Sequence, residues 1–130
     1  MKLKLLCMAA LATLALVPLA GAQSFTPLGY CQLTPAVGAV GSLLGCAGAW
    51  NAARGSIPPG ANAVILRAEG ATVRFRDDRL APSASVGIPI LPSDPPYVYE
   101  GSLTDLQFAA SVAGAIVDIE FVKIAAPPPL

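Results

Sequence analysis

VRFRDDR, from Val73 to Arg79, is the stretch that best indicates how this chain folds. Val73 and Phe75 alternate with two arginines, and the last three residues are all charged. Because successive side chains of a β-strand point to opposite faces, the two apolar residues can face a core while the two arginines face water. We therefore expect a half-buried strand that runs into a charged turn.

Other segments have the length and composition of short strands. Residues 63–68 are apolar apart from Arg67, and residues 115–123 alternate apolar with acidic side chains. Only Glu69, Gly70 and Ala71 lie between the run at 63–68 and the next expected strand, so these two strands are predicted to pair as a hairpin. The full set of expected strands is 30–33, 63–68, 72–76, 86–91, 97–100, 107–109 and 115–123.

Turn signals separate these strands. Pro58-Pro59-Gly60 predicts a turn, the glycine spacing of residues 36–48 argues against a helix, and the prolines at 92–96 exclude regular structure there. Pro89 predicts that the strand at 86–91 is an edge strand or an irregular one. The sequence thus predicts an all-β domain of about six to eight short strands, a single small antiparallel β-sandwich or a jelly-roll-like barrel.

Residues 1–22 have the composition of a secretory signal peptide, with two lysines, an apolar run and a small-residue cleavage site before Gln23. The apolar run is shorter than the roughly 20 residues that a membrane span needs, so no stable span is expected after cleavage, although an uncleaved N-terminal anchor is an alternative. We divide the rest into a glycine-rich segment (23–57), a β-sandwich core (58–124) and a Pro-rich tail (125–130).

Two cysteines, Cys31 and Cys46, remain beyond the signal segment, which takes Cys7. An exported protein enters an oxidising compartment, so a disulfide between them is expected, closing a loop of about 15 residues. A metal site is disfavoured, because the chain has no histidine. No cofactor is predicted.

Charge limits the partners of the chain. Beyond residue 22, six basic residues stand against eight acidic ones, a net charge of −2. This balance lacks the basic footprint of a nucleic-acid-binding protein.

The sequence also predicts that this protein is not an enzyme. Histidine is absent, so the usual triads and dyads lack their base. Asp94, Glu100 and Asp105 lie close enough in sequence to serve as paired carboxylates, although their ordinary role is to keep turns hydrated.

Two groups of residues are candidate contact sites. Arg74, Arg76, Asp77, Asp78 and Arg79 are expected to form a cluster that either fixes a turn or makes salt bridges at a subunit interface. The aromatic residues Trp50, Tyr97 and Tyr99 form the candidate contact surface, able to stack on a sugar or a protein partner, with a place in the core as the alternative.

The motifs from residue 57 to residue 87 resemble a family of small bacteriophage and prophage proteins. That family carries a pattern like P-A-G-A-x-x-A-L-I-x-A-E-G, then V-R-[WYF]-R-D-D-G, then P-T-A-S-V-G. The corresponding segments here are 57–61 (IPPGA), 64–70 (VILRAEG), 73–78 (VRFRDD) and 81–87 (APSASVG). The family glycine after the aspartate pair is Arg79 in this chain, so the turn must change form or place Arg79 in a less favourable backbone region.

The resemblance implies a non-enzymatic virion structural protein, such as a decoration, fibre-base or tail-associated subunit. Its expected partners are further copies of itself, as a homo-oligomer, and other virion proteins, and its expected location is the virion. The alternative is a secreted or periplasmic binding module for a carbohydrate or an envelope protein, which accounts better for the signal segment and the disulfide.

Overall fold

The computed structural model describes residues 23–46 and 57–126. Within them, two four-stranded sheets pack as a small β-sandwich, as the sequence predicts, and the regular helix is limited to one short 3-10 turn. The elements are β1 (Phe25–Leu33), β2 (Gly41–Ser42), η1 (Leu43–Gly45), β3 (Ala63–Glu69), β4 (Val73–Arg76), β5 (Ile88–Ile90), β6 (Tyr97–Tyr99), β7 (Gln107–Ala110) and β8 (Ile116–Ile124).

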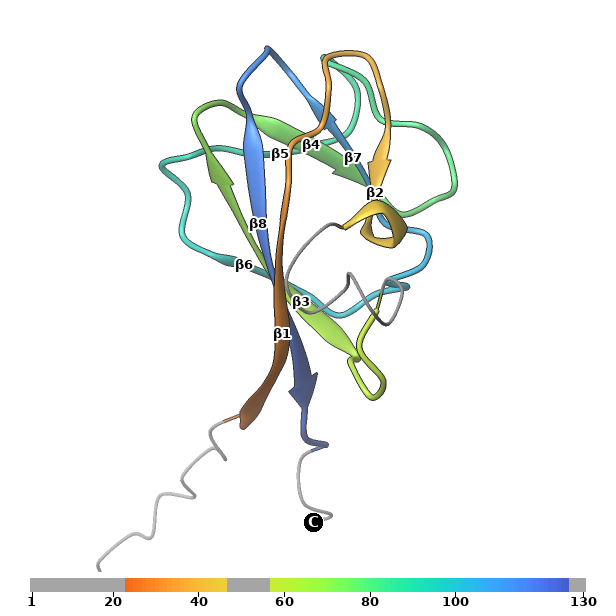
Figure 1. Cartoon of the computed structure of the whole chain (residues 1–130), viewed down its shortest axis with the longest axis vertical. Coiled ribbons are helices and arrows are strands. Elements are labelled where there is room, and N and C mark those ends of the chain that lie inside the picture. The colour runs from red at the N-terminus through yellow and green to blue at the C-terminus, as the bar shows by residue number, and fades with distance from the viewer. Residues whose placement is uncertain (1–22, 47–56, 127–130) are drawn as a thin grey trace, which may run out of the picture.

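The strands of both sheets pair in antiparallel fashion. Sheet A has the order β1-β8-β3-β6, and sheet B has the order β2-β7-β4-β5. In Figure 1 the start of β1 and the end of β8 lie side by side at one end of the molecule, in agreement with the pairing of Phe25 with Ile124.

The core lies between the two sheets and follows from strand alternation. On β8, Val117, Ile119 and Phe121 are fully buried, as the alternation at 115–123 predicts. They belong to the same buried cluster as Val73 and Phe75 of β4, which confirms the inward face of the VRFR segment.

A second, smaller apolar cluster contains Ala63, Val122 and Ile124. It lies on the other face of sheet A, because Val122 follows Phe121 and neighbouring residues in a strand point to opposite sides.

The predicted hairpin between residues 63–68 and 72–76 is wrong. Strand β3 pairs with β8 and β6 in sheet A, whereas β4 pairs with β7 and β5 in sheet B. The reason is the tight turn between them, in which the Ala71 N–H donates to the Glu69 carbonyl at 2.8 Å and Gly70 has a φ of 74°. This turn carries the chain from one sheet to the other instead of folding it back beside itself.

Glycine is required at residue 70. A Cβ there would lie 2.6 Å from the carbonyl oxygen of Gly114, in the turn between β7 and β8. The A-E-G motif therefore encodes a close approach of two turns.

The remaining differences concern element boundaries. The first strand begins at Phe25 rather than at residue 30, with a register shift between Pro27 and Gly29. The fifth strand is shorter than expected and, as Pro89 predicts, lies at the edge of its sheet. The expected turn at Pro58 is present, because the Ala61 N–H donates to the Pro58 carbonyl at 3.1 Å.

Some predictions concern residues that the structure does not describe. The signal segment 1–22, Trp50 and residues 127–130 of the tail lie outside the described residues. Among those described, no helix is long and apolar enough to cross a membrane.

The expected disulfide between Cys31 and Cys46 is present, with a Cα–Cα distance of 5.9 Å. Cys31 belongs to β1, an edge strand of sheet A. Cys46 follows β2, an edge strand of sheet B, and the 3-10 turn η1. Both residues are buried. The bond thus links edge segments of the two sheets at one side of the sandwich.

Removal of this disulfide by the double substitution Cys31→Ala and Cys46→Ala should lower the free energy of unfolding by about 3 kcal/mol, the chain-entropy value for a loop of this length. Urea unfolding followed by circular dichroism measures the change. Reduction of the unchanged protein should lower its urea midpoint to that of the variant. An equal midpoint for oxidised protein and variant would contradict the stabilising role of the bond.

Candidate functional site

Arg74 fastens the loop between β4 and β5 onto the outer side of sheet B. Its Nε donates to the Ala84 carbonyl at 3.1 Å and its Nη1 donates to the Gly87 carbonyl at 3.0 Å. The side chain is half-buried, on the face of β4 opposite Phe75. Arg74 therefore has a structural role, because it holds the β4–β5 loop against the strand.

Gly87 allows that loop to lie close to β4. Its φ is 125°, and a Cβ at this position would lie 2.9 Å from the Phe75 carbonyl oxygen. The final glycine of the S-V-G motif is thus required by the backbone. Together with Arg74, it shows that the motif segments at 73–78 and 81–87 hold each other in place.

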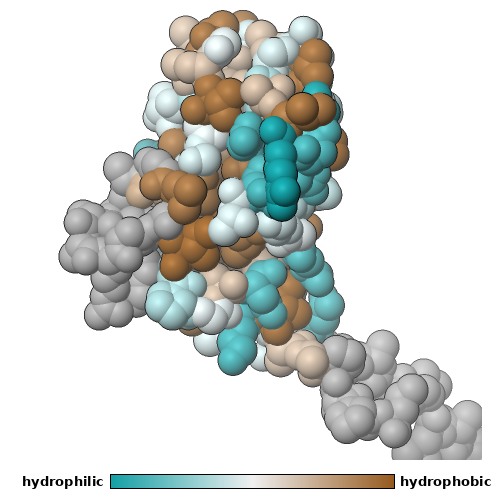
Figure 2. Space-filling model, turned by 90° about the vertical axis from the view of Figure 1, so that its right-hand side faces the viewer, coloured by the Kyte–Doolittle hydropathy of each residue, from teal (hydrophilic) through white to brown (hydrophobic). Residues whose placement is uncertain are grey.

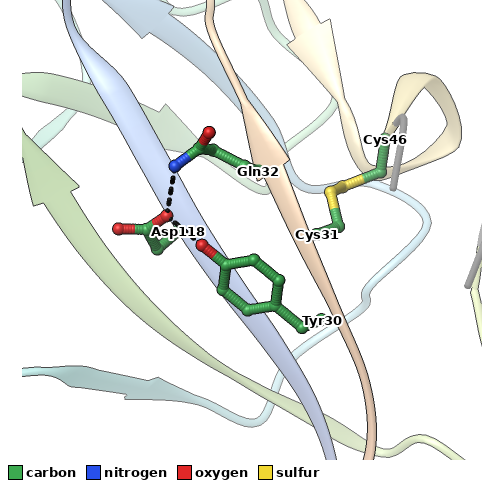
Figure 3. Close-up of a disulfide and its surroundings, with 5 residues drawn as sticks. All are labelled: Tyr30, Cys31, Gln32, Cys46 and Asp118. Carbon is green, nitrogen blue, oxygen red and sulfur yellow. Dashed lines mark hydrogen bonds between the residues drawn. A yellow bond between two sulfur atoms is a disulfide. The ribbon is translucent and has the colours of Figure 1, made fainter. Parts of the chain in front are cut away.

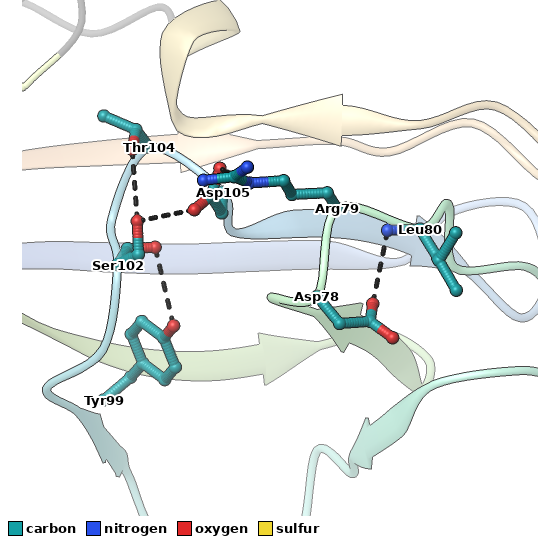
Figure 4. A network of polar contacts seen from close by, with 7 residues as sticks. All are labelled: Asp78, Arg79, Leu80, Tyr99, Ser102, Thr104 and Asp105. Carbon is teal, nitrogen blue, oxygen red and sulfur yellow. Dashed lines mark hydrogen bonds and ion pairs between the residues drawn. The ribbon is translucent and has the colours of Figure 1, made fainter.

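Arg76 and Asp78 form an exposed ion pair that closes the turn. The Arg76 Nε donates to Asp78 Oδ1 at 2.9 Å, and a second contact joins Nη2 to Oδ2. This hydrogen bonding lowers the pKa of the Asp78 carboxyl and raises the pKa of the Arg76 guanidinium. Asp78 also accepts from the Leu80 N–H at 3.3 Å, which fixes the next residue (Figure 4).

Asp77 links the same turn to the other sheet. Its carboxylate accepts a hydrogen bond of 3.0 Å from the hydroxyl of Tyr99 on β6. Burial, and after it this bond to Asp77, raises the pKa of Tyr99 to about 12. The Tyr99 ring meets Phe75 edge-on with 6.0 Å between centroids.

Tyr99 is therefore a core residue that connects the two sheets. Its side chain is only 6% exposed. This corrects its assignment to the candidate contact surface, since a buried ring cannot stack on a partner.

Arg79 stands where the resembling family has glycine, and its backbone is in the less favourable left-handed region expected for that position, with a φ of 65°. Its Nε lies 3.3 Å from Asp105 Oδ1, and its side chain is 82% exposed. Asp105 in turn accepts from the Ser102 hydroxyl at 2.9 Å. Figure 4 shows this contact between the turn after β4 and the loop that precedes β7.

Of the three carboxylates considered for catalysis, two form hydrogen bonds or ion pairs within loops. Asp94 accepts from the Leu91 N–H at 2.8 Å, and Asp105 is engaged with Ser102 and Arg79. Glu100 is exposed. Across the described residues, no group of three or more potential metal ligands gathers.

The side of the sandwich away from the disulfide carries exposed apolar residues around the edge strands β5 and β6. We call the surface formed by Ile88, Leu91 and Tyr97 the β5–β6 rim, and these residues are 52%, 41% and 43% exposed. A hollow of about 220 Å³ lies beside it, lined by Pro89, Pro95 and Pro96 together with Ile90, Asp94 and Tyr97. Another, of about 280 Å³, lies between Ile88 and the Arg76–Asp78 turn.

Large apolar side chains are exposed elsewhere as well, among them Leu44, Leu80 and Val112, which are 60%, 59% and 54% exposed. Figure 2, which shows the right-hand side of Figure 1, has hydrophobic surface in separate areas with hydrophilic residues between them. We take the β5–β6 rim as the candidate contact surface because it includes Tyr97, which the sequence singled out and which is 43% exposed.

The sequence did not single out a further polar group on the outer face of sheet A. There Tyr30 and Gln32 of β1 donate to the carboxylate of Asp118 on β8, the latter at 2.9 Å. The bond to Asp118 is the main cause that raises the pKa of Tyr30. Alternation along residues 115–123 places Asp118 and Glu120 on one face, but no sequence signal pairs this strand with β1.

Comparison of this chain with protein-family models, with curated proteins and with solved structures gives no match.

Alkaline pH should destabilise the protein through Tyr99. The pKa rises from 10.0 to about 12 on folding, so the stabilisation from this shift is complete below pH 10 and is lost as pH rises toward 12. Tyr99→Phe keeps the ring in the core and should show a shallower loss of stability over this range. Urea unfolding at a series of pH values measures it. If the free energy of unfolding fell equally steeply with pH in the variant and in the unchanged protein, the role of Tyr99 in the alkaline loss of stability would be contradicted.

Glycine should suit position 79 better than alanine. Both substitutions remove the contact with Asp105, but only alanine keeps a Cβ in the left-handed region, at a cost of about 1–2 kcal/mol. The greater freedom of glycine in the unfolded chain offsets about 0.4–1 kcal/mol of this. We expect Arg79→Gly to be more stable than Arg79→Ala by about 0.5–1 kcal/mol in thermal or urea unfolding. Equal stability would mean that the turn relaxes in the variant.

Proposed function

We propose that this chain is a non-enzymatic structural subunit of a bacteriophage or prophage virion, built as a homo-oligomer that also contacts other virion proteins. The candidate roles are decoration, fibre-base or tail-associated subunit. The resemblance of residues 57–87 to small phage proteins supports this proposal. The β5–β6 rim supplies the surface for assembly.

The observation that carries the proposal is the apolar β5–β6 rim beside a fixed charged turn. Ile88 and Tyr97 expose large side chains at the edges of both sheets. The Arg76–Asp78 pair lines the hollow next to Ile88. An apolar centre with charged groups at its border is the usual anatomy of a protein interface.

Strand addition is an unsuitable mode of contact at β5. Pro89 has no N–H to donate, and proline on an edge strand is a common means of preventing uncontrolled pairing between sheets. The contact we propose is therefore made by side chains packing at the rim.

Mass spectrometry of particles purified from an induced host tests this function. We expect the protein in stoichiometric amounts, with Gln23 as its first residue if it has passed through export. The double substitution Ile88→Glu and Tyr97→Glu should prevent incorporation and oligomerisation while the protein stays folded, because both positions are exposed. Val112→Glu, at an apolar position 54% exposed in the turn before β8, is the matched control and should assemble normally.

A secreted or periplasmic binding module for a carbohydrate or an envelope protein is the second candidate. The disulfide between Cys31 and Cys46 favours it, because such bonds persist in oxidising compartments. Absence from particles, with the protein recovered from the periplasm or the medium, would favour this candidate over the virion subunit.

A further inference from the structure

The outer face of sheet A presents two rows of side chains across its strands. The register aligns Val98, Ile65, Glu120 and Tyr30 in one row and Arg67, Asp118 and Gln32 in the next. Directly opposed residues in a sheet have Cβ atoms about 4.5–5.5 Å apart, so each row is a set of close neighbours. Residues from β1, β8, β3 and β6, far apart in the sequence, thus form one surface, which is polar except for Val98 and Ile65.

Asp118 is held at the centre of this surface. Both donors, the Tyr30 hydroxyl and Gln32 Nε2, bind the same oxygen, Oδ1. Figure 3 shows that the second oxygen of the carboxylate points away from these two residues. The carboxylate is therefore oriented in advance, and among the described residues its second oxygen accepts no side-chain hydrogen bond.

A hollow of about 360 Å³ lies over this surface, lined by Tyr30, Ile65, Arg67, Pro96, Asp118 and Glu120. Arg67 is exposed and lies opposite Asp118 in the register, yet the ion pairs within the described residues do not include this pair. The hollow therefore combines guanidinium donors, carboxylate acceptors and an exposed aromatic ring.

We propose that this hollow binds a carbohydrate. A sugar hydroxyl both donates and accepts a hydrogen bond, so it suits a lining in which Asp118 and Glu120 accept while Arg67 donates. Tyr30 and Ile65 supply apolar contact for the C–H face of a sugar ring. Two carboxylates disfavour an anion, and the arginine disfavours a simple cation.

The size of the hollow limits the ligand. Small-molecule sites usually measure about 300–1,000 Å³, and this one lies at the lower end of that range. It therefore suits a single sugar residue, at the end of a glycan or as one unit of a longer chain that crosses the face.

This inference does not depend on the assembly role. The hollow lies on the outer face of sheet A, whereas the β5–β6 rim carries the proposed subunit contact. A loss of sugar binding should leave incorporation into particles unchanged, so the two proposals can fail separately.

The test is an NMR titration of the oxidised, ¹⁵N-labelled protein with glucose, galactose, mannose and N-acetylglucosamine and with their short oligomers. We expect saturable shifts confined to residues near 30–32, 65–67 and 118–120 for at least one of these sugars. Arg67→Ala and Asp118→Asn should each weaken that binding by about tenfold, the effect of losing a hydrogen bond to a charged group.

Lys123→Ala is the matched control, because Lys123 is exposed on β8, the strand that carries Asp118, and does not line the hollow. The affinity of the Lys123→Ala variant for the sugar should equal that of the unchanged protein. Arg67→Ala is the decisive variant, since Arg67 is exposed and its loss does not disturb the Tyr30–Asp118 bond. Absence of saturable shifts with every sugar, shifts located elsewhere, or unchanged binding by Arg67→Ala would each overturn the proposal.

Discussion

The pairing of β8 with both β1 and β3 is the constraint on which the rest of the structure depends. It fixes which residues of β8 face the core, because a slip of a single residue would exchange the two faces of the strand. In the observed register Val117, Ile119 and Phe121 are buried against sheet B. The same register places Asp118 and Glu120 on the outer face, beside Tyr30 and Arg67. The core and the polar hollow are thus two consequences of one alignment.

The charged stretch from Arg74 to Arg79, at the end of β4 and in the turn after it, has a structural role in every contact that the structure gives it. Arg74 holds the Ala84 and Gly87 carbonyls, Arg76 holds Asp78, and Asp77 accepts from Tyr99 of the other sheet. Exposed ion pairs contribute about 0–1 kcal/mol each, so this stretch defines the loop geometry more than it stabilises the fold. A loop fixed in this way keeps Ile88 and its hollow in a constant position, which is what a contact surface requires.

Local pattern predicted the fold class, the buried face of β8, the disulfide and the edge position of the Pro89 strand. It failed where the outcome depends on contacts between distant segments. The three residues after β3 are short enough for a hairpin, but the close approach of Gly70 to Gly114 belongs to two turns that only the complete fold brings together. The sequence could not distinguish Tyr99 from Tyr97 for the same reason. Both rings pack on Phe75 of sheet B, but only the Tyr99 hydroxyl is shown to reach Asp77, in the turn after β4.

The two sides of the sandwich differ in how they are closed. On one side the bond between Cys31 and Cys46 links edge segments of the two sheets. On the other, the edge strands β5 and β6 are joined by a Pro-rich loop and leave Ile88 and Tyr97 exposed. Proline stiffens that loop, since it fixes φ and restricts the residue before it. The sandwich thus has a covalent link on one side and an apolar rim beside a stiff loop on the other, and this difference is the physical basis for proposing the second side as the contact surface.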